Sequence, residues 1–225
     1  MSVQLHPNDE LAKARHDSFG KTEMWYVLQA DKDAKLILGF NKKLTKEEYV
    51  TVLGQGKITS VLHAEPVKEG EIFFIAPGTV HAIGAGVLLA EIQQTSDITY
   101  RIYDWERPDT NGEPRQLHTE EAIDAINFNA EDPRISYFDV QNERVLVKEC
   151  SYFVTHKLTL TNTFLVENFS LDSCKVYMCV AGNATLITDH EKLSIHKGQT
   201  VLVPASCKRY TFETENATLL EVYIP

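Results

Sequence analysis

Short runs rich in Val, Ile, Phe and Tyr recur along the whole chain and restrict the folds that it can adopt. Gly, Pro, Asn and Asp separate the runs, which is typical of the strands and turns of an all-β sandwich or barrel. The runs cover residues 24–29, 35–40, 71–76, 87–94 and 100–103, and then 152–160, 164–171, 175–180, 184–188, 200–203 and 219–224. We therefore expect a mainly β protein.

Signals for helices are few. Residues 8–15 have the pattern of a short capped helix, and Thr45 with Glu48 forms a capping box before residues 49–53. Thr119 can cap a third helix over 120–126. The strand pattern lapses over residues 127–142, and we place a domain boundary there.

One stretch of sequence is echoed later in the chain. Residues 68–81 have the sequence K-E-G-E-I-F-F-I-A-P-G-T-V-H, and residues 197–208 have K-G-Q-T-V-L-V-P-A-S-C-K. In each, a Lys/Gly turn precedes a hydrophobic strand that stops at a proline, which cannot donate to the ladder. Four residues beyond the proline stand His81 in the first copy and Lys208 in the second. The echo predicts two related β-barrels, a metal-binding domain over 1–130 and a domain without metal ligands over 145–225.

Charge and cysteine content narrow the functional class. A formal net charge of -10 argues against nucleic acid as a partner, because phosphate contacts need a basic surface. The four cysteines show no C-x-x-C spacing, which favours buried free thiols. The chain has no apolar run long enough for a membrane span and no signal segment after Met1. We expect a cytoplasmic protein that does not bind membranes.

Four side chains in three segments are candidate metal ligands. Gln4 and His6 are two residues apart, so that on a strand they project to the same face. Glu23 follows a short predicted helix, and His81 comes from a distant strand end. Two imidazoles, a carboxylate and a carboxamide suit zinc and its first-row neighbours. Any one of these histidines alone is more often a structural imidazole, but the four residues together favour a metal site.

A second segment, residues 91–104, concentrates polar side chains between apolar strand residues. Buried polar groups cost free energy unless they bind one another or a ligand. Arg101 offers a planar fork that suits a phosphate or an enediolate. Lys21, two residues before Glu23, would place a cation near the metal. From composition alone, the segment could equally be an ordinary loop in which Arg101 pairs with Asp97 or Asp104.

These motifs together resemble the type I phosphomannose isomerases, which are zinc enzymes of the cupin superfamily. The resemblance is carried by S-V-Q-L-H-P at 2–7, G-K-T-E at 20–23, P-G-T-V-H-A-I-G-A-G at 77–86, Q-Q-T-S-D-I-T-Y-R-I-Y-D at 93–104 and R-Q-L-H-T-E at 115–120. It implies two cupin-like jelly-roll β-barrels with a few short helices. Family members carry a substantial segment before the first motif, so we expect the first barrel to be incomplete at its N-terminus.

The resemblance also implies an activity. Gln4, His6, Glu23 and His81 would hold one Zn²⁺, Arg101 would be the active-site arginine, and Lys21 would take part in catalysis or substrate contact. The implied reaction interconverts mannose 6-phosphate and fructose 6-phosphate through a cis-enediol, in a monomer or a homodimer. The proton-transfer base stays open among a carboxylate, a histidine and a metal-bound water.

Two other functions remain as alternatives. A truncated, inactive double cupin that binds a metal or a sugar would hold zinc without turning over substrate. A cupin iron oxygenase also uses two histidines and a carboxylate, but leaves open positions for O₂. Gln4 as a fourth ligand and the cations Lys21 and Arg101 argue against the oxygenase.

Overall fold

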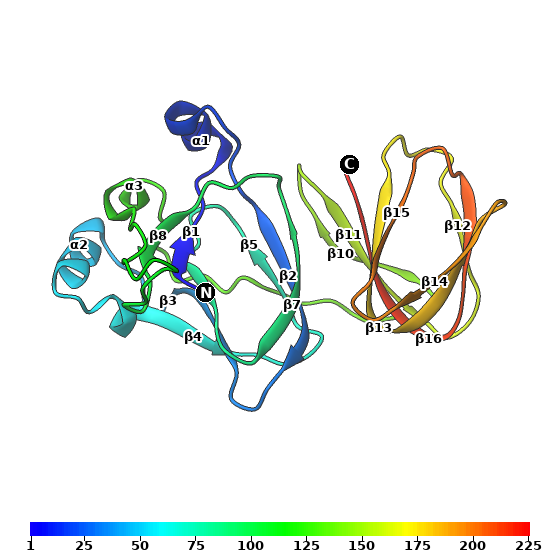
Figure 1. Ribbon diagram of the computed structural model, residues 1–225, viewed down its shortest axis with the longest axis horizontal. Helices are drawn as coiled ribbons and strands as arrows, with labels where there is room; N and C mark the ends of the chain where they lie inside the picture. Colours follow the sequence, from blue (N-terminus) through cyan, green and yellow to red (C-terminus); the bar gives the residue numbers. More distant parts are fainter. The chain divides into compact units, whose positions relative to one another are not determined.

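The computed structural model describes residues 1–225 and divides them into two compact units, Met1–Arg134 and Ile135–Pro225 (Figure 1). The elements of the first unit are β1 (Val3–Leu5), α1 (Asp9–His16), β2 (Glu23–Ala30), β3 (Lys35–Phe40), α2 (Lys46–Gly54), the 3-10 helix η1 (Ile58–Val61), β4 (Leu62–Pro66), β5 (Ile72–Ile75), β6 (His81–Ile83), β7 (Val87–Gln93), β8 (Tyr100–Tyr103) and α3 (Thr119–Ile123). A two-residue strand, β9 (Arg134–Ile135), lies at the junction. The prediction of a mainly β protein with a few short helices is confirmed.

Two antiparallel sheets build the first unit, in the orders β4-β3-β6-β1-β8 and β7-β2-β5-β9. Trp25 and Phe73 of one sheet pack with Leu36 and Leu38 of the other, which forms a core between them. The opposite face of the five-stranded sheet packs against α2, η1 and α3 through a second apolar cluster (Figure 1). The five-stranded sheet is therefore covered on both faces, and side chains that point inward are enclosed.

The helix starts follow the capping signals in two of three cases. Asn8 caps α1 by accepting from the Leu11 amide, and Thr45 with Glu48 forms the predicted capping box of α2. The prediction for the third helix is wrong, because Thr119 is already its first helical residue. His118 occupies the N-cap and makes no side-chain cap bond.

The strand β1 is an interior strand of its sheet, between β6 and the edge strand β8. The Met1 ammonium donates to the Ile83 carbonyl at 3.3 Å, and the Trp105 indole donates to the Met1 carbonyl at 2.8 Å. The Gly78 amide donates to the carbonyl of His6 at 2.8 Å. A chain end fixed on both sides does not fray, so Gln4 and His6 have defined positions.

The turn between β5 and β6 depends on a glycine. Gly78 has φ +83°, and a Cβ there would lie 2.4 Å from the Ala125 carbonyl oxygen, whereas Gly112 has φ +86° with nothing within 4 Å. We expect Gly78→Ala to lower the free energy of unfolding by about 3 kcal/mol or more, and Gly112→Ala by about 1 kcal/mol. Urea denaturation of both variants measures the difference. Equal losses would contradict the argument from close approach.

Asp104, at the end of β8, anchors the polar loop that follows. It accepts from Arg115 Nε at 2.7 Å and from Arg107 Nη2 at 2.6 Å, and these guanidinium groups, Arg115 foremost, hold the pKa of Asp104 well below its usual range. A lowered folded-state pKa stabilises the fold above the unfolded value of about 3.9, and the contribution is lost as pH falls through the folded pKa.

We therefore expect Asp104→Asn to lower the melting temperature at pH 7, and we expect this effect to start to shrink as the pH falls below about 4. Melting curves of variant and wild type, followed by circular dichroism between pH 7 and pH 3, measure the gap. A gap that stays constant with pH would mean that the carboxylate charge is not responsible.

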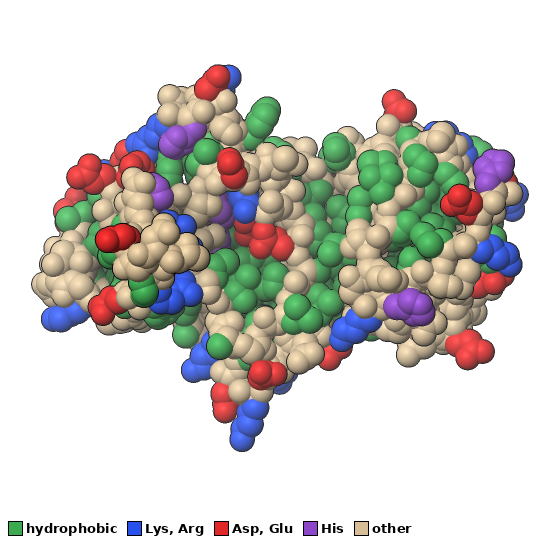
Figure 2. Space-filling model, in the orientation of Figure 1, with side chains coloured by type: hydrophobic (Ala, Val, Ile, Leu, Met, Phe, Trp, Pro, Cys, Tyr) green, Lys and Arg blue, Asp and Glu red, His purple; other side chains and the backbone are tan.

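The second unit is a sandwich built around two long strands. Its elements are β10 (Arg144–Glu149), β11 (Val154–Leu160), β12 (Phe164–Glu167), β13 (Lys175–Ile187), β14 (Lys192–His196), β15 (Thr200–Val203) and β16 (Arg209–Tyr223). β13 and β16 pair with each other, with β11 and β15 beside one half of this pair and β12 and β14 beside the other. Figure 2 shows hydrophobic side chains on the face between β12 and β15.

The two echoed turns contain the same kind of backbone hydrogen bond and can be aligned on it. Thr79 N donates to Ala76 O in the first unit, and Cys207 N donates to Pro204 O in the second. In this alignment Arg209, the first residue of β16, takes the place of His81, the first residue of β6. Alignment of the two prolines places Lys208 opposite His81, whereas alignment on this hydrogen bond places Arg209 there, because the second strand ends at Val203, directly before its proline.

Two further expectations concern cysteines and membranes. All four cysteines are free, but only Cys179 is buried, and the other three are partly exposed. No helix of the protein has the length and apolar character needed to cross a membrane.

Candidate metal centre

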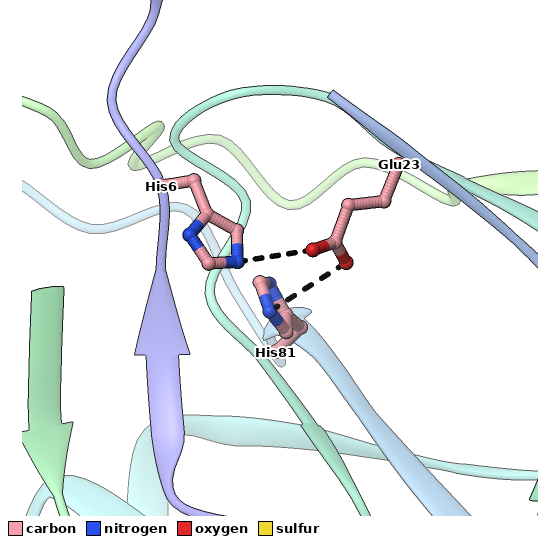
Figure 3. Close-up of side chains that lie close together, drawn as sticks. All are labelled: His6, Glu23 and His81. Carbon is pink, nitrogen blue, oxygen red and sulfur yellow. Dashed lines mark ion pairs between the residues drawn. The ribbon is translucent and has the colours of Figure 1, made fainter. Parts of the chain in front are cut away.

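Strand pairing brings the candidate residues to one face. Gln4 of β1 pairs with His81 of β6 on one side and with Arg101 of β8 on the other, so the three side chains form a row across the sheet. His6 follows Gln4 by two residues and projects towards the same interior. Glu23, the first residue of β2, reaches in from the facing sheet (Figure 3).

Three of these residues form a compact buried cluster. His6 Nε2 lies 3.1 Å from Glu23 Oε1, and His81 Nε2 lies 3.9 Å from Glu23 Oε2. One ligand atom from each residue lies within 4.8 Å of the other two, and each residue is at most 1% exposed. Few arrangements other than a cation site bring two imidazole nitrogens to one buried carboxylate.

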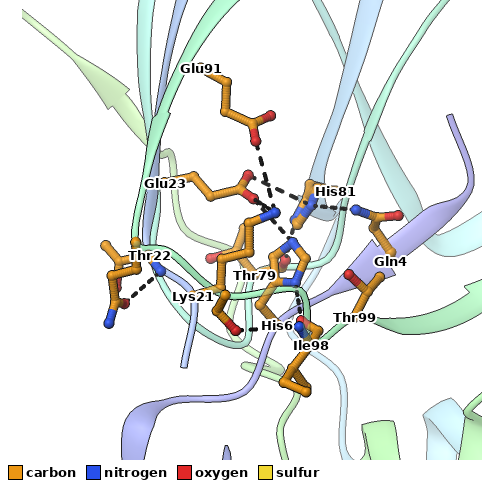
Figure 4. Close-up of polar contacts among 12 residues, drawn as sticks. Gln4, His6, Lys21, Thr22, Glu23, Thr79, His81, Glu91, Ile98 and Thr99 are labelled. Carbon is orange, nitrogen blue, oxygen red and sulfur yellow. Dashed lines mark hydrogen bonds and ion pairs between the residues drawn. The ribbon is translucent and has the colours of Figure 1, made fainter. Parts of the chain in front are cut away.

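Backbone carbonyls fix the orientation of both imidazoles. His6 Nδ1 lies 2.7 Å from the Ile98 carbonyl oxygen, and His81 Nδ1 lies 2.9 Å from the Thr79 carbonyl oxygen (Figure 4). A carbonyl can only accept, so each Nδ1 carries a proton and donates it. In a neutral imidazole held in this way, the Nε2 lone pair points towards Glu23, which is the arrangement of a metal-ligating histidine.

The pKa values of the cluster favour its metal-binding forms. Burial raises the pKa of Glu23, but the contact with His6 and the charges of His81 and Lys21 outweigh burial and lower it to about 2. Burial, helped by the nearby His6, lowers the pKa of His81 to about 4. At neutral pH the carboxylate is therefore charged and the His81 imidazole is neutral.

Two atoms of the cluster lack a hydrogen bond. His6 Nε2 and Glu23 Oε2 are buried without a partner, and such orphaned polar atoms cost free energy. A divalent cation between them would satisfy both. The nitrogen and oxygen donors are those that zinc prefers, so the residues fit a zinc ion.

Gln4 lies beside this cluster with its amide held by a serine. Its Nε2 is 3.5 Å from His81 Nε2, and its Oε1 accepts from the Ser2 hydroxyl at 3.0 Å. As a ligand, Gln4 must offer its oxygen, which requires the amide to turn by half a rotation. The Ser2 hydroxyl can accept as readily as it donates, so it can hold either orientation.

Two charged residues line the cluster on the β2 side. Lys21 Nζ lies 3.1 Å from Glu23 Oε1 and 3.9 Å from Glu91 Oε1 (Figure 4). The Glu91 carboxylate also accepts from the Trp25 indole at 3.1 Å, and burial together with the charge of Glu23 raises its pKa. We did not single out Glu91 from the sequence, although a carboxylate inside an apolar strand was a usable signal.

Arg101 does not pair with either aspartate that the sequence offered. Its Nε donates to the Ser2 hydroxyl at 3.3 Å, and its Nη1 donates to the Gln116 carbonyl at 2.9 Å. Burial and the neighbouring Arg115 lower its pKa, but it remains a cation. Ser2 therefore connects Arg101 with Gln4 through a single hydroxyl.

Comparisons with known proteins agree with this architecture. A family described as mannose-6-phosphate isomerase, cupin domain, matches residues 142–224. The mannose-6-phosphate isomerase ManA of Bacillus subtilis (strain 168) is 36% identical over 220 residues, which is 95% of this chain and 68% of that protein. The mannose-6-phosphate isomerase of Streptococcus mutans is 31% identical over 215 residues, or 95% of this chain and 67% of that protein.

Solved structures show the same fold. The crystal structure of the mannose 6-phosphate isomerase from Bacillus subtilis superposes with a TM-score of 0.88 at 28% identity, covering 98% of this chain and 70% of that one. A putative mannosephosphate isomerase from Archaeoglobus fulgidus, at 20% identity and a TM-score of 0.76, supports the fold alone. The cupin fold implied by the sequence motifs is confirmed. The chain belongs to the mannose-6-phosphate isomerase family.

Proposed function

We propose that this chain is a zinc-dependent aldose-ketose isomerase that interconverts mannose 6-phosphate and fructose 6-phosphate. The observation that carries the proposal is the buried cluster of His6, Glu23 and His81, in which both imidazoles turn their Nε2 atoms towards one carboxylate. The family to which the chain belongs supplies the substrate.

Gln4, His6, Glu23 and His81 would hold the ion. A bound divalent ion supplies positive charge that stabilises an oxyanion on the sugar, an effect worth several kcal/mol. Arg101 lies next to Gln4 in the sheet and adds a second cation on the same face. It stabilises the enediolate or binds the phosphate, and Lys21 keeps the potential beside Glu23 positive.

Glu91 is the best-placed group for moving the proton. The isomerisation takes a proton from C2 of the aldose and returns one to C1, so it needs a base that later acts as an acid. Glu91 lies beside Lys21 without touching the proposed ligands, and it is partly exposed where Glu23 is enclosed. Its raised pKa suits a group that both accepts and donates.

We expect Glu91→Gln to lower kcat by about 10²- to 10⁴-fold while metal content is unchanged, because the amide cannot accept the C2 proton. Exchange of the C2 hydrogen with deuterated solvent should fall in parallel with turnover. The exposed Glu69→Gln serves as the control and should behave as wild type. Rapid C2 exchange in Glu91→Gln would assign the proton transfer to another group.

The proposed function is tested on the purified chain. Metal content after dialysis against metal-free buffer and coupled assays of the reaction in both directions should show stoichiometric zinc and turnover. Zinc without turnover would instead support a binding module. Oxygen uptake after loading with iron would support the oxygenase.

A further inference from the structure

The second unit contains a cavity that the isomerase reaction does not use. It has a volume of about 810 Å³, within the range of small-molecule sites. Leu186, Leu193, Val201 and Val203, from β13, β14 and β15, line its apolar floor. Phe169, which follows β12, lines it as well and is 68% exposed. The hydrophobic side chains between β12 and β15 in Figure 2 mark this face.

Acidic and basic side chains also line this cavity, around its apolar residues. Asp189, His190 and Glu191 come from the turn between β13 and β14, and Lys208 and Arg209 come from the turn before β16. Two carboxylates and two cations balance, so the cavity has no excess positive charge with which to attract an anion. Figure 2 shows acidic, basic and histidine side chains around the same patch.

The side chains that come from the turn between β13 and β14 have unused hydrogen-bonding groups. The hydrogen bonds of these residues are made by their backbones with Thr188: the amides of His190 and Glu191 donate to its hydroxyl, and the Glu191 carbonyl accepts from its amide at 2.9 Å. The side chains of Asp189, His190 and Glu191 make no hydrogen bond or ion pair within the protein. On the basic side, Lys208 donates to the Leu171 carbonyl at 3.3 Å, and Arg209 lies 3.8 Å from Glu167.

The wall of the cavity is the turn that echoes the turn presenting His81. In the first unit, this turn leads into the buried His81 of the metal centre. In the second unit, Arg209 replaces the histidine and points to the rim, 64% exposed. The second unit therefore has the same turn as the first, but it places an exposed arginine where the first unit has a buried histidine.

We propose that this cavity binds an uncharged saccharide. An exposed aromatic ring above an apolar floor contacts the C–H face of a sugar ring, and unpaired carboxylate and imidazole groups bind its hydroxyls. Unpaired carboxylates on one side disfavour a phosphorylated sugar. The site therefore differs in ligand class from the metal centre of the first unit.

The test is titration of the chain of residues 1–225 with methyl α-D-mannopyranoside, methyl β-D-glucopyranoside and cellobiose, followed by saturation-transfer NMR. At least one of these sugars should bind with a Kd on the order of a millimolar. Phe169→Ala should weaken that binding by about tenfold or more, since the stacking surface is lost. Asp189→Ala should weaken it through the lost hydroxyl contacts. Phe138→Ala, another highly exposed phenylalanine of the second unit that lies outside the cavity, is the matched control and should bind as wild type.

Three results would overturn the proposal. The first is no binding of any neutral sugar by the wild type, and the second is binding that survives Phe169→Ala. The third is tighter, Phe169-dependent binding of mannose 6-phosphate, which would show an anion site. Isomerase turnover should be the same in Phe169→Ala and Phe138→Ala, so failure here leaves the proposed reaction of the first unit untouched.

Discussion

Replacing His81 with alanine is expected to remove the metal ion and to stop isomerase turnover. His81 supplies one of the two imidazoles of the cluster, and its Nδ1 proton is donated to the Thr79 carbonyl. Loss of groups that merely orient a ligand costs 10- to 100-fold in metal affinity, so loss of a ligand should cost about 100-fold or more. Metal per chain after dialysis and the coupled isomerase assay measure the two effects.

The control for this variant is His63→Ala. His63 is a partly exposed histidine of the same unit that pairs with Glu65, away from the cluster. It should retain both metal and activity. Circular dichroism of both variants shows whether the fold is kept, and zinc bound in full by a folded His81→Ala protein would refute the metal centre.

Replacing Arg101 with alanine should leave the metal in place and reduce catalysis. Arg101 is adjacent to Gln4 in the sheet but holds no position among the buried ligands. Removal of one preorganised donor to a developing oxyanion lowers kcat by about 10²- to 10³-fold. Arg101→Lys should restore part of the rate, because the charge returns without the planar fork.

Arg107→Ala is the matched control for the lost charge. Arg107 is about half exposed and is paired with Asp104. Its removal should leave kcat near the wild-type value. Full activity of Arg101→Ala would remove this residue from the mechanism, and loss of zinc in that variant would give it a structural role instead.

Local sequence patterns predicted much of the fold but not its long-range pairing. β3, β8 and β15 have the bounds that the apolar runs gave. β6 is only three residues long, too short for alternation to be recognised, and it carries His81. Strands that were expected separately at 175–180 and 184–188 form one strand, because Gly182, a turn signal, instead lies between two bulges of β13.

The candidate site was recognisable by residue type, whereas its arrangement was not. Gln4, His6, Glu23 and His81 stood out as possible ligands, and the structure brings His6, Glu23 and His81 within one cluster. The row of Arg101, Gln4 and His81 depends on the register of strands far apart in sequence, which no local pattern contains. Glu91 was missed although a carboxylate inside an apolar strand is a usable signal, and only the strand register places it opposite Trp25.

The position of β1 between β6 and β8 affects when the site can form during synthesis. This strand leaves the ribosome before its two hydrogen-bonded neighbours, β6 and β8, which end at residues 83 and 103. The Gln4 amide contacts His81, which lies 77 residues further along the sequence. A nascent chain whose β8 is still inside the ribosome therefore cannot form the row of His81, Gln4 and Arg101. Measuring zinc binding by ribosome-bound chains of increasing length would show at which length the first barrel closes.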